Sequence, residues 1–197
     1  MTRRILLAMI LMTSVMAWSE PDYPGLQVDV RRDGSLYTFD ASFDTPLTKC
    51  AAYNYLTDYE AAKSLPGVIE STASRESANQ VRVERTADER VLFFHVRLHS
   101  VMEYTESPYD SIAFNQLKGD SRLFRGNWHV EPGQQGSSTL RFQGEWEPDT
   151  LIPLFIIDHF AKNGLRDRFS AIAQLALKLK DKLSTSCGSR HLARMAE

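Results

Sequence analysis

Apolar and polar residues alternate along most of the first three quarters of this chain. In the segment 35–43, for example, Tyr37, Phe39 and Phe43 occupy alternate positions between polar residues. A period of two is typical of strands that bury one face. The pattern predicts strands at 35–43, 68–77, 80–86, 91–104, 110–118, 123–130 and 139–146. Short turn-forming stretches such as Ser107-Pro108 and Gly119-Asp120 separate several of them and favour antiparallel hairpins.

Two short helices are predicted between the first and second strands. Thr45-Pro46 has the composition of a helix start, because Thr can cap a helix and Pro suits its first turn. Leu47, Cys50 and Tyr53 then follow at helical spacing. A second helix is predicted at 59–65, where Pro66-Gly67 ends it.

The period changes to three or four after residue 150. One continuous apolar stripe then predicts a helix of about 30 residues, or roughly 45 Å, at 151–183. Asp149 or Thr150 is the expected cap, and Pro153 fits the first turn. We expect residues 184–197 to form a flexible tail. The stripe consists of Leu154, Ile157, Ala161, Leu165, Phe169, Ile172, Ala176, Leu179 and Leu183.

This order of elements predicts an α+β fold in one domain at 35–183. A single antiparallel sheet has two faces, and one long amphipathic helix can cover only one of them. We therefore expect a curved sheet of about seven strands wrapped around the C-terminal helix, with its other face in water. Such an arrangement can leave a space where the sheet and the helix diverge.

The first residues of the chain have the composition of a secretory signal peptide. Arg3 and Arg4 precede an apolar run at 5–16, and small residues suited to cleavage follow it. The run is shorter than the roughly 20 apolar residues of a membrane-spanning helix. We predict a signal peptide at 1–19 and a periplasmic or secreted protein, with cleavage after Ala17 or Ser19 and the choice between Sec and twin-arginine export left open.

The charge balance of the chain limits the classes of partner that it is expected to bind. The chain has 23 Lys and Arg against 25 Asp and Glu, and removal of the predicted signal peptide would make it slightly more acidic. This balance predicts no nucleic-acid partner, and no later segment predicts a membrane span.

Cys50 and Cys187 are the two cysteines of the chain. In an oxidising compartment they are candidates for a disulfide, the alternative being two unpaired thiols.

The sequence contains no familiar catalytic, metal-binding or cofactor-binding motif. His95 and His99 are four residues apart, which on a strand is about 13 Å, so they cannot share a metal ion. Adjacent Asp158 and His159 point in different directions on a helix and are interpreted as a solvated flank. Ser186-Cys187-Gly188 lies in the predicted tail. We therefore expect no metal, no cofactor and no catalytic residue that the motifs can identify.

Four stretches of the chain resemble the START-like superfamily of helix-grip proteins, in the branch of polyketide cyclase/dehydrase-like and coenzyme-Q-binding proteins. They are 56–60, 65–71, 124–130 and 144–148, together with the final helix. The resemblance covers roughly 35–183. It implies a cavity for an apolar ligand such as a lipid, a quinone or a polycyclic compound. It does not imply one activity, because a shared fold carries many functions.

Aromatic side chains are the main candidates for the walls of that cavity. They lie on the strand faces that we interpret as inward, or on the helix, although plain core packing explains such positions as well. Tyr104 is the preferred polar contact, because its hydroxyl can bind a ligand, and Trp128 and Trp146 are the preferred walls, expected to be buried on the helix-facing side. The candidates are Phe94, Tyr104, Phe114, Trp128, Phe142, Trp146, Phe155 and Phe160.

Three functions remain open on this evidence. The first is an exported, non-enzymatic binding or carrier protein for an apolar small molecule or lipid. The second is an aromatase/cyclase-type enzyme with Tyr104 or a buried His as the general acid–base, since ring closure needs little beyond positioning and a proton relay. The third is a protein-interaction module of the cell envelope that uses the outer face of the sheet, which a large exposed apolar patch there would favour.

Overall fold

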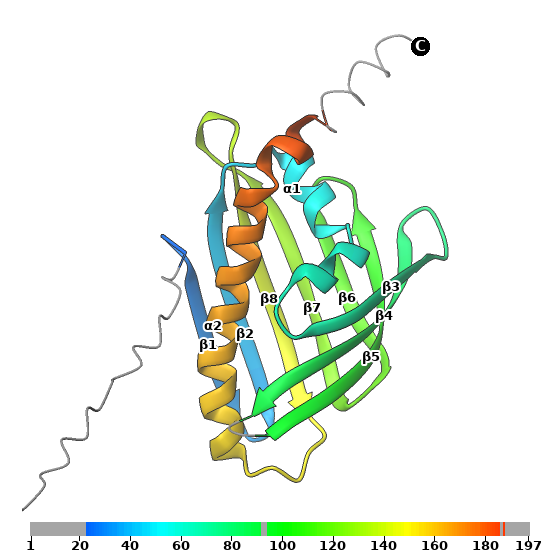
Figure 1. The fold of residues 1–197 in the computed structure, drawn as a ribbon, viewed down its shortest axis with the longest axis vertical. Coiled ribbons are helices and arrows are strands. Elements are labelled where there is room, and N and C mark those ends of the chain that lie inside the picture. The colour runs from blue at the N-terminus through cyan, green and yellow to red at the C-terminus, as the bar shows by residue number, and fades with distance from the viewer. Residues whose placement is uncertain (1–22, 92–93, 186, 188–197) are drawn as a thin grey trace, which may run out of the picture.

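An antiparallel sheet of eight strands curves around one long helix in the part of the chain that the computed structural model describes, which is residues 23–91, 94–185 and 187 (Figure 1). Two short helical segments follow the second strand and cover the rest of the concave face. The elements are β1 (Gln27–Asp33), β2 (Leu36–Thr45), α1 (Lys49–Leu56), η1 (Glu60–Ser64), β3 (Val68–Arg75), β4 (Gln80–Val91), β5 (Phe94–Ser107), β6 (Ser111–Gly119), β7 (Ser121–Pro132), η2 (Gln134–Gly136), β8 (Ser138–Pro148) and α2 (Leu154–Lys178).

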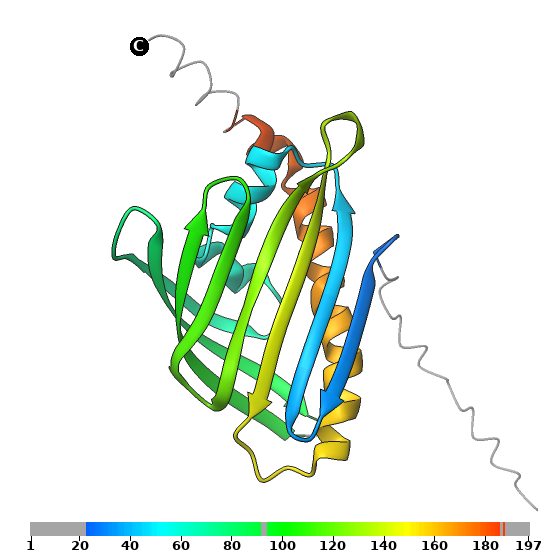
Figure 2. The same ribbon diagram turned by 180° about the vertical axis from the view of Figure 1, so that it is seen from behind.

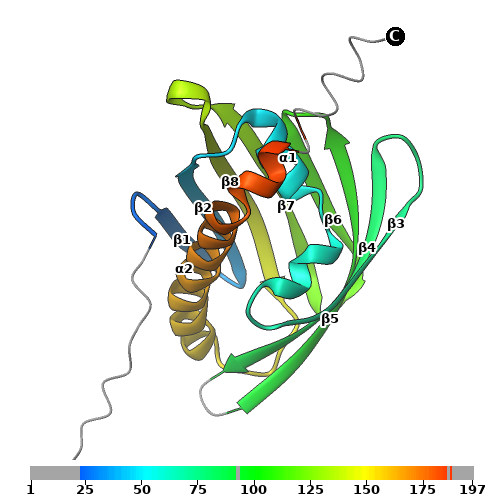
Figure 3. The same cartoon turned by 45° about the horizontal axis from the view of Figure 1, so that its top comes forward.

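The strand order across the sheet is β1-β2-β8-β7-β6-β5-β4-β3, and every neighbouring pair is antiparallel. The single crossover joins β2 to β3 and carries α1 and η1 over the concave face. Seen from behind, the convex face carries no helix (Figure 2). The view with the top turned forward shows α2 beside β1 and β2, while η1 fills the space toward β3 and β4 (Figure 3). The predicted α+β helix-grip fold is confirmed.

The sheet has one strand more than the sequence predicts, namely β1. Most side chains of β1 are exposed, and its last residues, Arg31, Arg32 and Asp33, are all charged, so no buried alternation marks it. Beyond that, β4 continues to Val91 instead of ending at Thr86, because its polar second half pairs with the start of β5. Backbone pairing therefore extends past the alternating apolar residues.

The first helix begins three residues later than predicted. Thr45 is the last residue of β2, where it is buried and paired with Ser138 of β8. Thr48 takes the capping role: its Oγ1 accepts a hydrogen bond of 3.2 Å from the backbone N–H of Ala51. The second predicted helix is the short η1 segment, whose first turn is capped by the Asp58 carboxylate through the N–H of Ala61 at 3.3 Å.

The long helix α2 is anchored to the first two strands near its N-terminal end. Asp158 accepts a hydrogen bond of 2.7 Å from the hydroxyl of Tyr37 and another of 2.7 Å from Nε of Arg32. The Tyr37 hydrogen bond, followed by that of Arg32, lowers the pKa of Asp158 below its ordinary value. The sequence pattern did not predict this ion pair, because β1, which carries Arg32, was not expected; the side chains of Arg32 and Asp158 remain partly exposed, at 36% and 29%.

Two further contacts hold α2 farther along its length. Arg168 forms an ion pair with Glu89 of β4, on the opposite side of the sheet from β2. After α2, helical turns continue through Thr185, and Cys187 forms a disulfide with Cys50 of α1, with 6.1 Å between the two Cα atoms. The long helix is thus attached to both arms of the sheet and to α1.

Gly126 makes room for the aromatic core on the concave face. A Cβ atom at this position would lie 2.5 Å from the carbonyl oxygen of Gln143 and 2.7 Å from Cζ of Phe114. Because the backbone of Gln143 and the packed ring of Phe114 are both close, neither can easily move to make room for an added methyl group. We expect Gly126→Ala to lower the free energy of unfolding by about 1–3 kcal/mol, measured by urea denaturation.

Asn115→Ala is the matched control, because Asn115 is exposed on the strand next to β7 and faces the convex side. Its free energy of unfolding should change by no more than about 0.5 kcal/mol. Equal stability of wild type and Gly126→Ala would show that the Phe114 ring moves aside without cost.

Of the described residues, those in helices form no segment with the length and apolar character needed to cross a membrane. The predicted signal peptide, 1–19, lies outside the described residues, as does 188–197 of the predicted tail.

Candidate functional site

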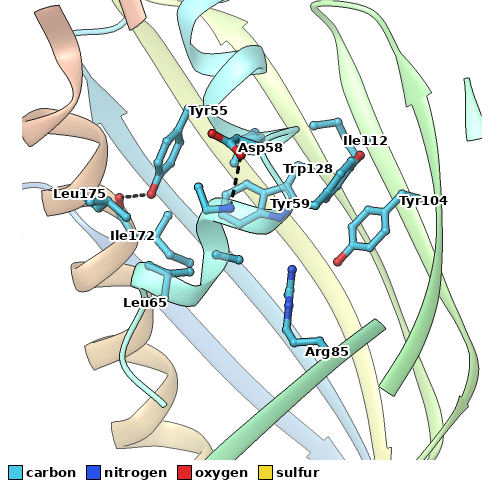
Figure 4. A pocket seen from close by; sticks show the side chains of 13 residues that line it. Tyr55, Asp58, Tyr59, Leu65, Arg85, Tyr104, Ile112, Trp128, Ile172 and Leu175 are labelled. Carbon is cyan, nitrogen blue, oxygen red and sulfur yellow. Dashed lines mark hydrogen bonds between the residues drawn. The ribbon is translucent and has the colours of Figure 1, made fainter. Parts of the chain in front are cut away.

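A pocket of about 120 Å³ lies between the concave face of the sheet, α1, η1 and α2 (Figure 4). The upper part of α2 and the end of α1 form one wall, and η1 forms the cover. Strands β4 to β7 supply the other side. Most of the lining is apolar or aromatic, with Asp58 and Arg85 the two ionisable side chains besides the tyrosines. The lining residues are Tyr55, Leu56, Asp58, Tyr59, Ala61, Ala62, Leu65, Arg85, Tyr104, Ile112, Trp128, Ile172 and Leu175.

Local hydrogen bonds fix the two helical walls. The hydroxyl of Tyr55 donates to the carbonyl oxygen of Ile172 at 2.8 Å, which joins α1 to α2 across the pocket. Burial raises the pKa of Tyr55 above its ordinary value, so this hydroxyl keeps its proton. Ser71 of β3 donates to the carbonyl oxygen of Tyr59 at 2.6 Å. The start of η1 is thereby fixed to the edge strand of the sheet.

The turn after η1 depends on Gly67. Its φ of 79° lies in the left-handed region that favours glycine. Its carbonyl oxygen accepts a hydrogen bond of 2.7 Å from the N–H of Asp88. A Cβ at this position would approach the Asp88 carbonyl oxygen to 3.1 Å. The turn therefore sits directly against β4, beside the Glu89–Arg168 ion pair.

Arg85 brings a cation to this apolar pocket. It lies on β4 in register with Ser71, and its Nε donates a hydrogen bond of 3.4 Å to the Ser71 hydroxyl oxygen. Figure 4 shows its side chain rising from the strand toward η1. Among the described residues no carboxylate forms an ion pair with it. Its two terminal nitrogens are therefore available to a ligand.

Tyr104 and Trp128 add two neutral hydrogen-bond donors. The ring of Tyr104 packs on Tyr59, with 4.6 Å between the ring centroids. The hydroxyl of Tyr59 is already used by Glu106, whereas that of Tyr104 makes no hydrogen bond to any described residue. The indole N–H of Trp128 is likewise without an acceptor in the described part of the protein. Both donors can serve a bound molecule.

A buried carboxylate lies beside the pocket. Glu106 is 6% exposed and accepts hydrogen bonds from the hydroxyls of Tyr59 at 2.9 Å and Tyr53 at 3.3 Å. Arg75 donates to both of its oxygens, at 3.1 and 3.2 Å. The carboxylate is thus fully engaged within the protein. Its role is to hold the ring of Tyr59 in place as part of the pocket wall.

Alkaline pH should weaken this arrangement. Burial, followed by the negative charge of Glu106, raises the pKa of Tyr53 from 10.0 to about 12. Burial, followed by the hydrogen bond to Glu106, also raises the pKa of Tyr59. A raised pKa means that the folded state holds the proton more tightly, so this contribution to stability is complete below pH 10 and is lost as pH rises toward 12.

We therefore expect the unfolding temperature to fall as pH rises above 10, and Tyr53→Phe to make that dependence less steep. Calorimetry at a series of pH values measures both. If the unfolding temperature falls with pH equally steeply in Tyr53→Phe and in the wild type, the contribution assigned to Tyr53 is contradicted.

The structure places two of the predicted cavity residues, Tyr104 and Trp128, in the pocket wall. Phe114 and Phe142 are buried directly beneath it, with 5.9 Å between their ring centroids. They are core residues that support the wall. In addition, Phe142 contacts Phe169 of α2 at 5.1 Å, which closes the aromatic core against the helix.

Trp146 is on the helix-facing side but away from this pocket. It packs on Tyr37 with 5.5 Å between ring centroids, and its indole N–H donates to the Ser121 hydroxyl at 2.8 Å. Trp128 also faces the helix, since its ring contacts Phe169 at 5.7 Å. Both tryptophans are only partly buried, less than we predicted.

Phe155 requires a correction. We predicted it as a cavity residue, but its side chain is 73% exposed on α2. The reason is helical phase: Ile157, two positions later, is 4% exposed and takes the inward position. The side chains of Phe94 and Phe160 lie outside the described residues.

Sequence reasoning missed most of the polar and helical part of the pocket, including Tyr55, Tyr59, Arg85 and Leu175. Ile172 was noted only as part of the apolar stripe of the long helix. One signal was present for Arg85: it interrupts the apolar face of β4, two positions after Val83, which is completely buried. A charged side chain on the same strand face as buried residues indicates a binding or catalytic site.

In the range 23–91, 94–185 and 187 there is no group of His, Cys, Asp or Glu that could hold a metal ion.

Comparisons with solved structures show the same fold at low identity. The STAR-related lipid transfer protein from Xanthomonas axonopodis (fragment 25–204) matches with a TM-score of 0.67 and 15% identity, covering 79% of this chain and 96% of that one. The Zhui aromatase/cyclase from Streptomyces sp. R1128 matches with a TM-score of 0.61 and 13% identity, covering 73% and 95%. The di-domain ARO/CYC StfQ from the steffimycin biosynthetic pathway gives 0.62 and 13%, covering 76% and 52%.

The chain thus spans about half the length of the di-domain aromatase/cyclase StfQ. No curated protein matches it by sequence. The sequence profile of the family described as "Polyketide cyclase / dehydrase and lipid transport" matches residues 45–173, which include α1, η1, most of the sheet and most of α2. With the helix-grip fold and a pocket between sheet and helix, this match shows that the chain belongs to the polyketide cyclase/dehydrase and lipid transport family of START-like proteins.

Proposed function

We propose that this chain is a non-enzymatic binding or carrier protein that holds an apolar small molecule, or the apolar part of a lipid, between its sheet and α2. The observation that carries the proposal is the pocket itself, whose walls are mostly apolar or aromatic. Pockets of this composition bind through the removal of apolar surface from water, worth roughly 25 cal/mol per Å².

The size of the pocket limits what it holds. Its volume of about 120 Å³ is below the roughly 300–1,000 Å³ of sites that enclose a whole drug-sized ligand. The pocket therefore suits a single ring or a short alkyl chain. A larger lipid would need η1 or α2 to move, and the contacts that hold both elements oppose such movement.

We also propose export to the periplasm or the outside of the cell. The residues that support it are the cationic and apolar start of the sequence, 3–16, and the disulfide between Cys50 and Cys187. Disulfides persist in oxidising compartments and are rare in the cytosol of mesophiles. Fractionation of cells that express the full chain tests this part of the proposal, which requires the protein in the periplasmic or medium fraction and a shortened N-terminus by mass spectrometry.

An aromatase/cyclase-type enzyme is the second candidate. It is favoured by one observation: among the described residues, the hydroxyl of Tyr104 has no hydrogen-bond partner and the guanidinium of Arg85 has no ion-pair partner, and both side chains line the pocket. Such groups can orient a carbonyl compound and transfer a proton. Conversion of a poly-ketone substrate by the protein, lost in Tyr104→Phe, would favour this candidate over the carrier.

The interaction-module hypothesis receives less support. The convex face of the sheet carries cross-strand ion pairs such as Arg125–Glu145 and Arg141–Glu131. A surface of that kind differs from the broad apolar patch that an interaction face would need.

Extraction of the natively purified, mature protein with organic solvent, followed by mass spectrometry, tests the carrier proposal. We expect one class of apolar or amphipathic compound at a level comparable to the protein. Addition of that compound to delipidated protein should raise its unfolding temperature. If nothing co-purifies and panels of lipids and quinones leave the unfolding temperature unchanged, the proposal fails.

A further inference from the structure

We infer that the pocket selects amphipathic ligands whose head group carries a negative charge, with Arg85 as its counter-ion; this inference rests on the proposed binding function and names its ligand class. The head group can be a carboxylate or a phosphate monoester, which share charge and acceptor oxygens.

The guanidinium of Arg85 has unused hydrogen-bonding capacity. Within the described part of the chain its one hydrogen bond is that of Nε to Ser71, at 3.4 Å. Other arginines are already neutralised: Arg75 lies 3.1 Å from Glu106, and Arg168 is paired with Glu89. A guanidinium presents N–H groups in a planar fork that matches two oxygens of a carboxylate or phosphate. At Arg85 the two terminal nitrogens remain for this purpose.

The carboxylates near the pocket do not supply the missing countercharge. Glu89 follows Arg85 on the same face of β4 but pairs with Arg168 of α2. Glu106 is occupied by Arg75 and two tyrosines. Asp58 lines the pocket, yet its carboxylate caps η1 and forms no ion pair with Arg85. Asp58 is exposed to solvent, whereas Arg85 is partly buried and remains without an ion-pair partner among the described residues, so Arg85 is the group that a ligand's anionic head can pair with.

The charge of Arg85 affects which ligands can bind, because a bound ligand displaces the water around it. Arg85 is partly exposed, so water solvates it while the pocket is empty of ligand. A neutral ligand that fills the pocket would remove this water and leave a charge unpaired in apolar surroundings, which is unfavourable. An anionic head replaces the lost water with a charge-assisted pair. The hydroxyl of Tyr104 and the indole N–H of Trp128 are donors in the same pocket and suit the same acceptor oxygens.

The test compares three short probes of equal chain length: hexanoate, hexyl phosphate and hexanol. Their affinities for the delipidated full chain are measured by isothermal titration calorimetry. We expect at least one of the two anions to bind roughly tenfold to a hundredfold more tightly than hexanol, as one hydrogen bond to a charged group allows. The ratio of the two anion affinities distinguishes carboxylate from phosphate.

Arg85→Gln should abolish this preference without weakening the binding of hexanol. Arg82→Gln is the matched control, because Arg82 lies on the same strand, faces outward and pairs with Glu76 at 3.0 Å; it should keep the preference. Arg85→Lys, which keeps the charge, should keep part of it and shows that the site tolerates substitution.

Two results would overturn the inference while the binding function stands: hexanol bound as tightly as both anions by the wild type, or an anion preference unchanged in Arg85→Gln. Absence of binding by all three probes, together with nothing co-purifying in the extraction described above, would instead overturn the proposed function and this inference with it.

Discussion

Removal of the disulfide between Cys50 and Cys187 should lower the free energy of unfolding by about 4–5 kcal/mol, the largest effect that we expect from a change at one site. The two residues are 137 positions apart, and closing so long a loop restricts the unfolded chain strongly in the chain-entropy model. The double variant Cys50→Ser/Cys187→Ser, compared with the oxidised wild type by urea denaturation, measures the difference.

The reducing agent itself provides the control. Dithiothreitol should destabilise the wild type by a similar amount and leave the double variant unchanged. A wild type whose urea midpoint is the same with and without reductant would show that the cross-link adds nothing. The effect on ligand binding is a separate readout: because α1 and α2 both form pocket walls, we expect faster ligand release after reduction.

Replacement of Glu106 by Gln should cost about 2–3 kcal/mol of unfolding free energy, the second largest effect. Its carboxylate accepts hydrogen bonds from Tyr53 and Tyr59 and pairs with Arg75. A neutral amide has one acceptor oxygen in place of two, and its NH₂ group faces donors. Removing one partner of a buried pair costs up to about 5 kcal/mol, but Arg75 is half exposed and recovers part of that through hydration.

Glu103→Gln is the matched control for this change. Glu103 lies on the same strand, β5, on the face that includes Arg82 in the neighbouring strand. It should alter stability by no more than about 0.5 kcal/mol. Equal losses in the two variants would mean that the Glu106 network does not stabilise the fold. A loss of ligand affinity in Glu106→Gln alone would connect the network to the pocket through the position of Tyr59.

Much of the fold could be predicted from the spacing of apolar residues and the order of the elements along the chain. Tyr37, Phe39 and Phe43 alternate as predicted and are all buried, because a strand with one covered face must place its apolar residues on that face. The same reasoning fails for β1, where an edge strand is held by backbone hydrogen bonds and exposes charged residues. It also misplaces the end of β4, since backbone pairing does not require apolar side chains.

The site was harder to predict than the fold. Aromatic residues on inward faces, such as Tyr104 and Trp128, follow from the strand period. Which of them line open space and which are packed depends on where α1 and η1 lie, and the sequence pattern does not specify that. Arg85 was missed because a charged residue at an inward position was not examined as a ligand contact. Phe155 was misplaced because it was chosen for its aromatic ring although it lies off the predicted helix stripe, whose Ile157 and Ala161 are buried.

The central claim is that the space between sheet and α2 binds an apolar ligand, and blocking that space tests it most directly. Leu175 lines the pocket, whereas Leu177, two residues later on α2, is 50% exposed outside it. We expect Leu175→Trp to fill the pocket and to abolish binding of the neutral short-chain probe hexanol, measured by isothermal titration calorimetry, while Leu177→Trp binds it like the wild type. Equal binding of the probe by Leu175→Trp and Leu177→Trp would contradict the account.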